Sequence, residues 1–308
     1  MGTTWSVKFA TGSDVDERAV RDAIAARLAL VVAQMSQWEP HSDLSRFNRA
    51  QAGSWHILPE AFFAVLDATL ALARLTDGAY DPTVGALSEL WGFGAAGRRD
   101  GVPGDAEVEA ARRRAGWSRL SVDRHRCAVM QPGGLLLDLS SIAKGYAVDF
   151  VSDTLTRYGF FDHLVEIGGE LRGRGTKPDR SPWWVALEGD ESSENDAIVA
   201  LYELSVATSG DAQRFIAADG RKLSHTIDPR TGRPIPDALA AVTVFDRSCM
   251  RADALATALS VLGAKEGHAF ATSRGIAARF LVRGPHGLVQ RMTPACAAML
   301  PPARANTG

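Results

Sequence analysis

Asp253 and Thr257 stand four residues apart in the segment RADALATALSVLG (251–263), which is otherwise mostly Ala, Leu and Val. The apolar spacing predicts a helix, and residues four apart on a helix lie on one face, one turn above the other. Two hard oxygen donors on one face have two interpretations: a cap for a helix end, or half of a Mg²⁺ site. The segment alone leaves both open.

The segment LDLSSIAKGY (137–146) predicts a strand that ends at Asp138 and two serines, followed by the start of a helix. Free N–H groups and the positive end of the helix dipole make such a turn suited to anions. Lys144, in the first turn of that helix, adds a positive charge. The alternative is a Ser N-cap followed by an exposed Lys.

Two further segments carry acidic residues beside glycines. GAYDPTVG contains Asp81, which an Asx-type turn after a helix would explain on its own. VEIGGELRGRG places Glu170 beside a glycine pair, which indicates a bulge, a hairpin turn or the close approach of a ligand. It lacks the strand–turn–helix context of a dinucleotide fingerprint.

Two more segments place polar groups at strand ends. VATSGDAQRF ends a strand in hydroxyl and carboxyl groups, and SHTIDPRTGRPIP puts His225 in a turn-rich loop that looks rigid. A lone His is more often structural than catalytic, but a rigid polar loop favours chemistry. Together, the oxygen donors, anion-friendly turns and glycines predict a site for a phosphorylated ligand with Mg²⁺, without naming the ligand.

The elements that position these groups follow from apolar periodicity. We expect helices over roughly 14–38 (capped by Asp14 or Asp16), 59–78, 105–115, 142–158, 248–263 and 265–274. We expect strands over roughly 4–10, 117–122, 127–131, 135–138, 163–168, 170–175, 183–189, 198–210 and 240–246, with a closing hairpin of 276–284 and 287–292.

Helices and strands intermingle without strict βαβ alternation, which predicts an α+β fold with mainly antiparallel sheets. We expect one domain over residues 1–300 and a disordered tail over 301–308. Hydrophobic residues make up 46% and charged residues 23% of the chain, a normal balance for a globular protein.

Several classes of protein are disfavoured by the composition. The net charge of −2, with no long basic run, argues against a nucleic-acid partner. Cys127, Cys249 and Cys296 form no CxxC motif, so neither a zinc site nor a disulfide framework is indicated. Because no run of about 18 apolar residues is present, we expect no transmembrane segment.

Seven segments occur in the order expected for a known family. They are MSQWEPHSDLSRFN, GAYDPTVGALSELWGFG, LDLSSIAKGYAVD, VEIGGELRGRG, VATSGDAQRF, SHTIDPRTGRP and MRADALATALSVLG. Over residues 1–285 the chain resembles the ApbE-type FAD:protein FMN transferases. The resemblance implies a T-fold-like α+β architecture and a Mg²⁺-dependent enzyme. Such an enzyme moves the FMN half of FAD to a Thr or Ser hydroxyl of an acceptor flavoprotein, forming a phosphoester and releasing AMP.

The resemblance also implies roles for individual residues. Asp253 and Thr257 would bind Mg²⁺, with the backbone carbonyl of Ser141 as a third ligand. FAD contacts are implied at Met1, Ser36, Gln37, Trp38, Ala79, Tyr80, Asp81, Lys144 and the loop from His225 to Ile227.

The chemistry of such a reaction explains why residues of these types would be needed. Mg²⁺ and Lys144 would offset charge at the pyrophosphate, and Trp38 or Tyr80 offers a face for a flavin or adenine ring. We assign His225 as the base for the acceptor hydroxyl, because its ordinary pKa of about 6.5 suits proton removal near neutrality. Asp253 is the second residue assigned to catalysis, through the metal.

Alternatives remain at this point. An FAD pyrophosphatase would use the same site with water as the acceptor, and a non-catalytic flavin-binding module is a further option. The opening MGTTWSVKFA lacks the features of a signal peptide, so we expect a cytoplasmic protein as the sequence stands. A periplasmic or membrane-anchored location is the alternative if the N-terminus is truncated.

Overall fold

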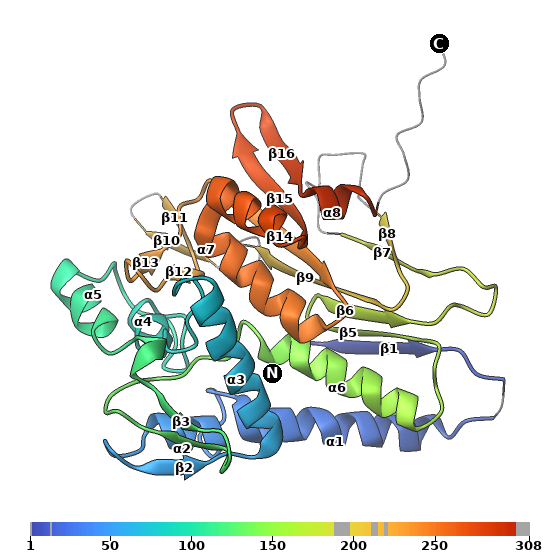
Figure 1. The fold of residues 1–308 in the computed structure, drawn as a ribbon, viewed down its shortest axis with the longest axis horizontal. Coiled ribbons are helices and arrows are strands. Elements are labelled where there is room, and N and C mark those ends of the chain that lie inside the picture. Colours follow the sequence, from blue (N-terminus) through green and yellow to red (C-terminus); the bar gives the residue numbers. More distant parts are fainter. Residues whose placement is uncertain (1, 13, 188–197, 211–214, 219–220, 300–308) are drawn as a thin grey trace.

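A computed structural model describes residues 2–12, 14–187, 198–210, 215–218 and 221–299 (Figure 1). Within these residues, seven strands form the central sheet, in the order β1 (Trp5–Phe9), β5 (His163–Ile167), β6 (Glu170–Arg174), β9 (Leu204–Gly210), β14 (Leu239–Asp246), β15 (Ala277–Gly284) and β16 (Gly287–Met292). Each neighbouring pair is antiparallel. The predicted α+β fold with mainly antiparallel sheets is confirmed.

Smaller antiparallel sheets accompany the central one. Their strands are β2 (Trp55–Ile57), β4 (Ala128–Met130) and β3 (Ser121–Asp123); β7 (Trp183–Ala186) and β8 (Ile198–Leu201); β10 (Phe215–Ala218) and β11 (Arg221–Ser224); and β12 (Ile227–Asp228) and β13 (Arg233–Pro234). The helices are α1 (Glu17–Met35), α2 (Asp43–Asn48), α3 (Glu60–Leu75), α4 (Gly85–Leu90), α5 (Asp105–Arg112), α6 (Ala143–Arg157), α7 (Cys249–Ser273) and α8 (Pro294–Ala297), with a 3₁₀ turn η1 (Trp117–Arg119).

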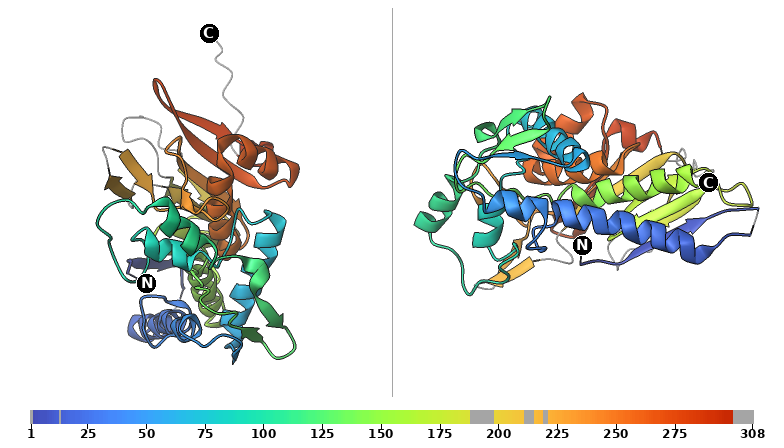
Figure 2. Two further views of the ribbon diagram at one scale, coloured as in Figure 1. Left: turned by 90° about the vertical axis from the view of Figure 1, so that its left-hand side faces the viewer. Right: turned by 90° about the horizontal axis from the view of Figure 1, so that it is seen from below.

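The two faces of the central sheet bury different layers. Val165 and Ile167 of β5 pack into a core shared with α1, α3 and α6, whereas Leu164 faces the apolar side chains of β7 and β8. Helix α7 covers β9, β14 and β15 on the same face as α6, and α1 lies outside α6 (Figures 1 and 2). The alternation of buried side chains along β5 therefore fixes which face meets the helices.

Most of the long elements lie where the periodicity predicted them. Of the two predicted caps for the first helix, Asp16 is the N-cap of α1, because its carboxylate accepts hydrogen bonds from the N–H groups of Arg18 and Ala19. The two helices predicted on either side of residue 264 are confirmed: they make up the segment α7, which leaves the helical conformation at Gly263 between them. Gly263 has φ 79°, a left-handed conformation that favours glycine.

Some predictions are wrong. Residues 117–122 begin with η1, so that strand is limited to β3. Residues 135–138 make only a single bridge, between Leu136 and Val84, because the N–H and carbonyl of Leu137 bond to the side-chain amide of Asn48 instead of a neighbouring strand. The segment 198–210 is two strands in different sheets, separated at Glu203, which has φ 49°. The short elements α2, α4, α8, β2 and β10 to β13 were not predicted.

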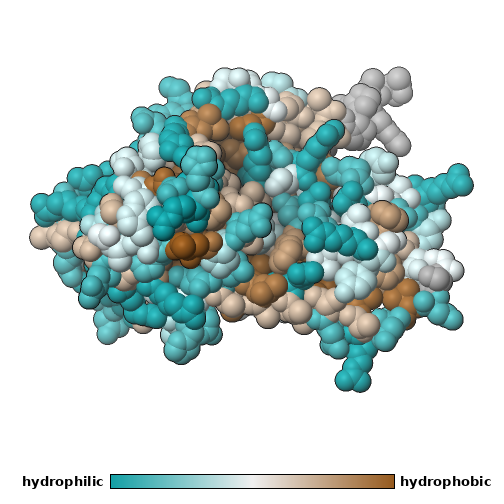
Figure 3. Space-filling view, turned by 60° about the horizontal axis from the view of Figure 1, so that its bottom comes forward, coloured by the Kyte–Doolittle hydropathy of each residue, from teal (hydrophilic) through white to brown (hydrophobic). Residues whose placement is uncertain are grey.

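Figure 3 shows one face of the molecule, on which hydrophobic patches are small and separated by hydrophilic residues. Among the described residues, no helix combines the length and apolar character needed to cross a membrane. The predicted tail, 301–308, lies outside the described residues.

Asp149 of α6 anchors the N-terminus of α7. Its carboxylate accepts hydrogen bonds from the N–H groups of Cys249 and Met250, each at 3.0 Å, and from Ser248 Oγ at 2.8 Å. It also pairs with Arg172 of β6. One carboxylate therefore satisfies two of the free N–H groups of α7 and ties this helix to α6 and to the sheet.

Replacing Asp149 by Ala should lower the free energy of unfolding by about 2–4 kcal/mol, because charged hydrogen bonds are lost and Arg172 keeps a partly buried, unpaired charge. Urea titration followed by circular dichroism measures the change. Asp153→Ala is the matched control on the same helix, since its side chain is 54% exposed and lies 3.8 Å from Arg174. It should change stability by less than about 0.5 kcal/mol. Equal losses for the two variants would contradict the anchoring role.

Candidate functional site

A cavity of about 450 Å³ is lined by α1, α6, α7, β6, β9 and the loops between them. This volume falls in the range of about 300–1,000 Å³ that small-molecule sites usually have. The described residues that the sequence assigned to a site all line it: Ser36, Gln37, Trp38, Ala79, Tyr80, Asp81, Ser141, Lys144, His225, Ile227, Asp253 and Thr257. Met1 lies outside the described residues, and contact of each lining residue with a ligand stays a prediction.

The turn after α3 is braced by Asp81. Asp81 Oδ1 accepts hydrogen bonds from the N–H of Thr83 at 2.8 Å and from its hydroxyl at 2.6 Å, and Oδ2 accepts one from the N–H of Trp117. This is the predicted Asx-type turn. Burial raises the pKa of Asp81, and these donors oppose the rise. The carboxylate therefore shapes the loop that presents the buried Tyr80, whose hydroxyl accepts a hydrogen bond from Ser141 Oγ.

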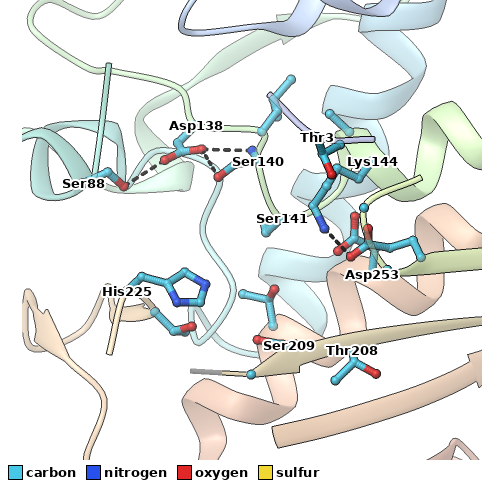
Figure 4. Close-up of a pocket in the computed structure, with 18 of the residues that line it drawn as sticks. Thr3, Ser88, Asp138, Ser140, Ser141, Lys144, Thr208, Ser209, His225 and Asp253 are labelled. Atoms are coloured by element: carbon cyan, nitrogen blue, oxygen red, sulfur yellow. Dashed lines mark hydrogen bonds and ion pairs between the residues drawn. The ribbon is translucent and has the colours of Figure 1, made fainter. Parts of the chain in front are cut away.

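Asp138 braces the neighbouring turn in the same way (Figure 4). Its Oδ1 accepts hydrogen bonds from the N–H and hydroxyl of Ser140, and its Oδ2 from Ser88 Oγ at 2.8 Å. Helix α6 then begins at Ala143, preceded by Ile142 with no side-chain cap. The Ser N-cap considered for this segment is therefore wrong, and the first N–H groups of α6 need another acceptor.

Asp253 supplies that acceptor from α7. Its Oδ2 accepts a hydrogen bond from the N–H of Gly145, in the first turn of α6, at 2.9 Å. The two helices approach so closely that a Cβ on Gly145 would lie 2.4 Å from the carbonyl oxygen of Cys249. The N-terminus of α6 is thus stabilised by a carboxylate of the protein itself. Both interpretations of Asp253 survive, because it caps a different helix with one oxygen and still lines the cavity.

Three ionisable groups meet at this wall of the cavity. Lys144 forms an ion pair with Glu170, and Asp253 lies beside them. Glu170 is 2% exposed and Asp253 5%, and burial raises the pKa of both carboxyls. For Lys144 burial favours the neutral amine, but Asp253 and Glu170 outweigh it, so the pKa of Lys144 is raised. Lys144, Glu170 and Asp253 therefore place one ammonium and two carboxyl groups in the wall of the cavity, where they could contact a polar ligand.

His225 lies on the opposite side of the view from Lys144 in Figure 4. Its ring packs edge-to-face on Phe93, with 6.3 Å between the ring centroids. The loop that follows is fixed by Trp91, whose Nε1 donates a hydrogen bond to the carbonyl of Gly232 at 2.8 Å. An imidazole held in such a loop suits proton transfer to or from a ligand in the cavity.

Residues 1–280 match the model of the ApbE family. The chain belongs to the ApbE family. Among its curated relatives, the FAD:protein FMN transferase of Vibrio cholerae is 38% identical, over 93% of this chain and 86% of that protein. The FAD:protein FMN transferase of Haemophilus influenzae is 33% identical, over 96% and 88%. The predicted family and the transferase class are therefore confirmed.

Solved structures of ApbE proteins share this fold closely. The Pseudomonas stutzeri flavinyl transferase ApbE, apo form, superposes with a TM-score of 0.90 and 42% identity, over 97% of this chain and 94% of that one. The flavin transferase ApbE from Vibrio cholerae gives a TM-score of 0.91 and 36% identity, over 97% and 96%.

The ApbE cavity also contains residues that we did not assign to the site. Thr208 and Ser209 line it from the end of β9. Asp138 lines it from the loop before α6, and Glu170 lines it from the start of β6. Thr208, Ser209 and Asp138 stand where an apolar strand pattern ends in polar residues, and Glu170 follows a glycine pair. Ser88 had no such signal, because it lies inside the short helix α4.

The residues of this cavity fit a Mg²⁺ ion. Asp253, Thr257 and Ser141 all line the cavity. A carboxylate, a hydroxyl and a backbone carbonyl are hard oxygen donors of the kind that suit Mg²⁺. In addition, the buried Glu170 Oε2 makes no hydrogen bond to any described residue. Metal binding itself stays a prediction.

Proposed function

We propose that this protein is a Mg²⁺-dependent FAD:protein FMN transferase. The acceptor is a Thr or Ser hydroxyl of a flavoprotein, whose oxygen forms a bond to the phosphorus of the FMN half of FAD. The bond from that phosphorus to the AMP oxygen breaks, and AMP leaves. The observation that carries the proposal is the convergence of hard oxygen donors, an ammonium, aromatic side chains and a histidine on one cavity in an ApbE chain.

Binding of FAD is assigned to the groups that line the cavity. Trp38 is 47% exposed, so its indole face is open to a flavin or adenine ring. Gln37 Nε2 is buried and makes no hydrogen bond to a described residue, which leaves a donor for a polar group of the ligand. Lys144 offers its ammonium to the diphosphate.

The chemical step needs charge offset and a proton acceptor. Asp253, Thr257 and the Ser141 carbonyl would hold a Mg²⁺ ion, which would supply positive charge to offset the diphosphate. Lys144 adds a second positive group at the same wall. His225 takes the proton of the acceptor hydroxyl as the new P–O bond forms. Hydrolysis to FMN and AMP would use the same residues, with water in place of the acceptor.

Mixing the protein with FAD, Mg²⁺ and a candidate acceptor flavoprotein should raise the acceptor mass by one FMN unit, measured by intact mass spectrometry. His225→Ala should slow this transfer by about 10²–10⁴-fold, because the base is lost. Release of AMP and free FMN with an unmodified acceptor would favour the pyrophosphatase instead. Unchanged transfer by His225→Ala would remove the histidine from the base role.

Asp253→Asn should weaken Mg²⁺ binding by at least about 100-fold, because the carboxamide keeps the size of the side chain but removes its charge. Isothermal titration with Mg²⁺ measures the affinity, and transfer should be lost in parallel. Asp237→Asn is the control, since Asp237 pairs with Arg283, is half exposed and does not line the cavity. Wild-type Mg²⁺ affinity in a folded Asp253→Asn protein would refute the metal role.

Trp38→Ala should weaken FAD binding by about 10-fold, the loss expected for one aromatic stacking contact. Quenching of flavin fluorescence reports the dissociation constant. Trp55→Ala makes a matched control, because Trp55 is 48% exposed but lies in β2, outside the cavity. If both variants bind FAD equally well, Trp38 does not contact the ligand.

A further inference from the structure

A tight glycine turn between β5 and β6 places Glu170 in the wall of the cavity. Gly168 and Gly169, with φ of 63° and 99°, form the tight connection from β5 to β6. Both conformations favour glycine, and a Cβ at Gly168 would also lie 2.7 Å from Thr3 Oγ1. The turn makes Glu170 the first residue of β6, where it is 2% exposed and lines the cavity.

The two oxygens of Glu170 have different surroundings. One pairs with Nζ of Lys144, and the other is buried without a hydrogen bond to any described residue. A buried ion pair contributes little to stability once the cost of desolvating both groups is counted. Stability alone therefore gives a weak reason for an acid at this position.

Lys144 supplies a stronger reason. Its ammonium ends a long flexible stem in the first turn of α6, and about a third of its side chain is exposed. Without a fixed partner, that stem would sample many rotamers and lose freedom when a ligand bound. The other acid nearby, Asp253, directs one of its oxygens to the N–H of Gly145.

We propose that Glu170 is a positioning residue, whose carboxylate holds the Lys144 ammonium at the cavity wall before the diphosphate of a flavin dinucleotide arrives. The ligand in this statement rests on the proposed function. The restraint of Lys144 by Glu170 does not, and it is measured without any ligand.

The first experiment compares how fast Lys144 is acylated by a water-soluble N-hydroxysuccinimide ester in flavin-free protein, using peptide mass spectrometry. Lys265, which is exposed on α7, serves as the internal reference. Glu170→Gln should raise labelling of Lys144 relative to Lys265 by about 10-fold, the factor expected when a charged hydrogen bond is lost. Glu166→Gln is the matched control.

Glu166 suits this purpose because it lies on the same hairpin but contacts Ser6 Oγ and the N–H of Gly169 instead of Lys144. Its replacement should leave labelling unchanged. Unaltered labelling of Lys144 in folded Glu170→Gln protein would overturn the proposal, whatever reaction the protein catalyses.

The second experiment measures transfer of FMN at saturating FAD and Mg²⁺ for Glu170→Gln, Lys144→Met and the double variant. Glu170→Gln should lower kcat by about 10-fold in the wild-type background and have no further effect beside Lys144→Met, because it acts through the ammonium. A purely structural role would lower kcat in both backgrounds, together with the free energy of unfolding, and would overturn the proposal. If the unchanged protein transfers nothing to any acceptor, the proposed function fails, and the labelling result still decides whether Glu170 restrains Lys144.

Discussion

The site depends on the contact between the N-terminus of α6 and the first turns of α7. Gly145 allows the two backbones to approach, and its N–H donates to the carboxylate of Asp253. A helix N-terminus stabilises an anion, so the first turn of α6 and the Lys144 ammonium together oppose the cost of burying the Asp253 carboxylate. Asp149 secures the same junction from the other side by capping α7. The cavity wall is therefore built from helix ends, whose positions the central sheet sets.

The helix ends place three ionisable side chains at the cavity wall, where burial leaves little water to solvate their charges. Asp253 and Glu170 are both buried beside Lys144, and burial raises the pKa of each carboxyl. Two acids against one ammonium leave room for a cation, and a divalent ion would then let an anionic diphosphate approach. The charge of Asp253, Glu170 and Lys144 would be complementary to that of a diphosphate only if a divalent cation were also bound. This supports treating the three side chains and the cation as one binding site.

The sequence predicted the long elements well because their apolar periodicity is strong, and helices α1, α3, α6 and α7 lie close to where it placed them. The prediction of strands failed where backbone groups bond to side chains instead of to a neighbouring strand. The backbone N–H and carbonyl of Leu137 bond to the side chain of Asn48, so the segment before Asp138 is a braced loop and not a strand. Most residues of the site were predicted from the resemblance to the ApbE family and not from apolar periodicity. Their convergence on one cavity depends on contacts between distant segments, such as Gly145 with Asp253, which periodicity cannot supply.

The roles of the acidic residues separate once their partners are known. Asp81 was implied as an FAD contact by the family resemblance, and Asp138 was not assigned to the site, yet both carboxylates are held by local donors and brace adjacent turns. Asp253 and Glu170 each receive fewer donors and face the cavity. A carboxylate already held by N–H and hydroxyl groups has few lone pairs left, so Asp253 and Glu170 keep more capacity than Asp81 and Asp138 to accept a further donor. The loops are thus made rigid by one pair of acids so that the other pair can remain available for chemistry.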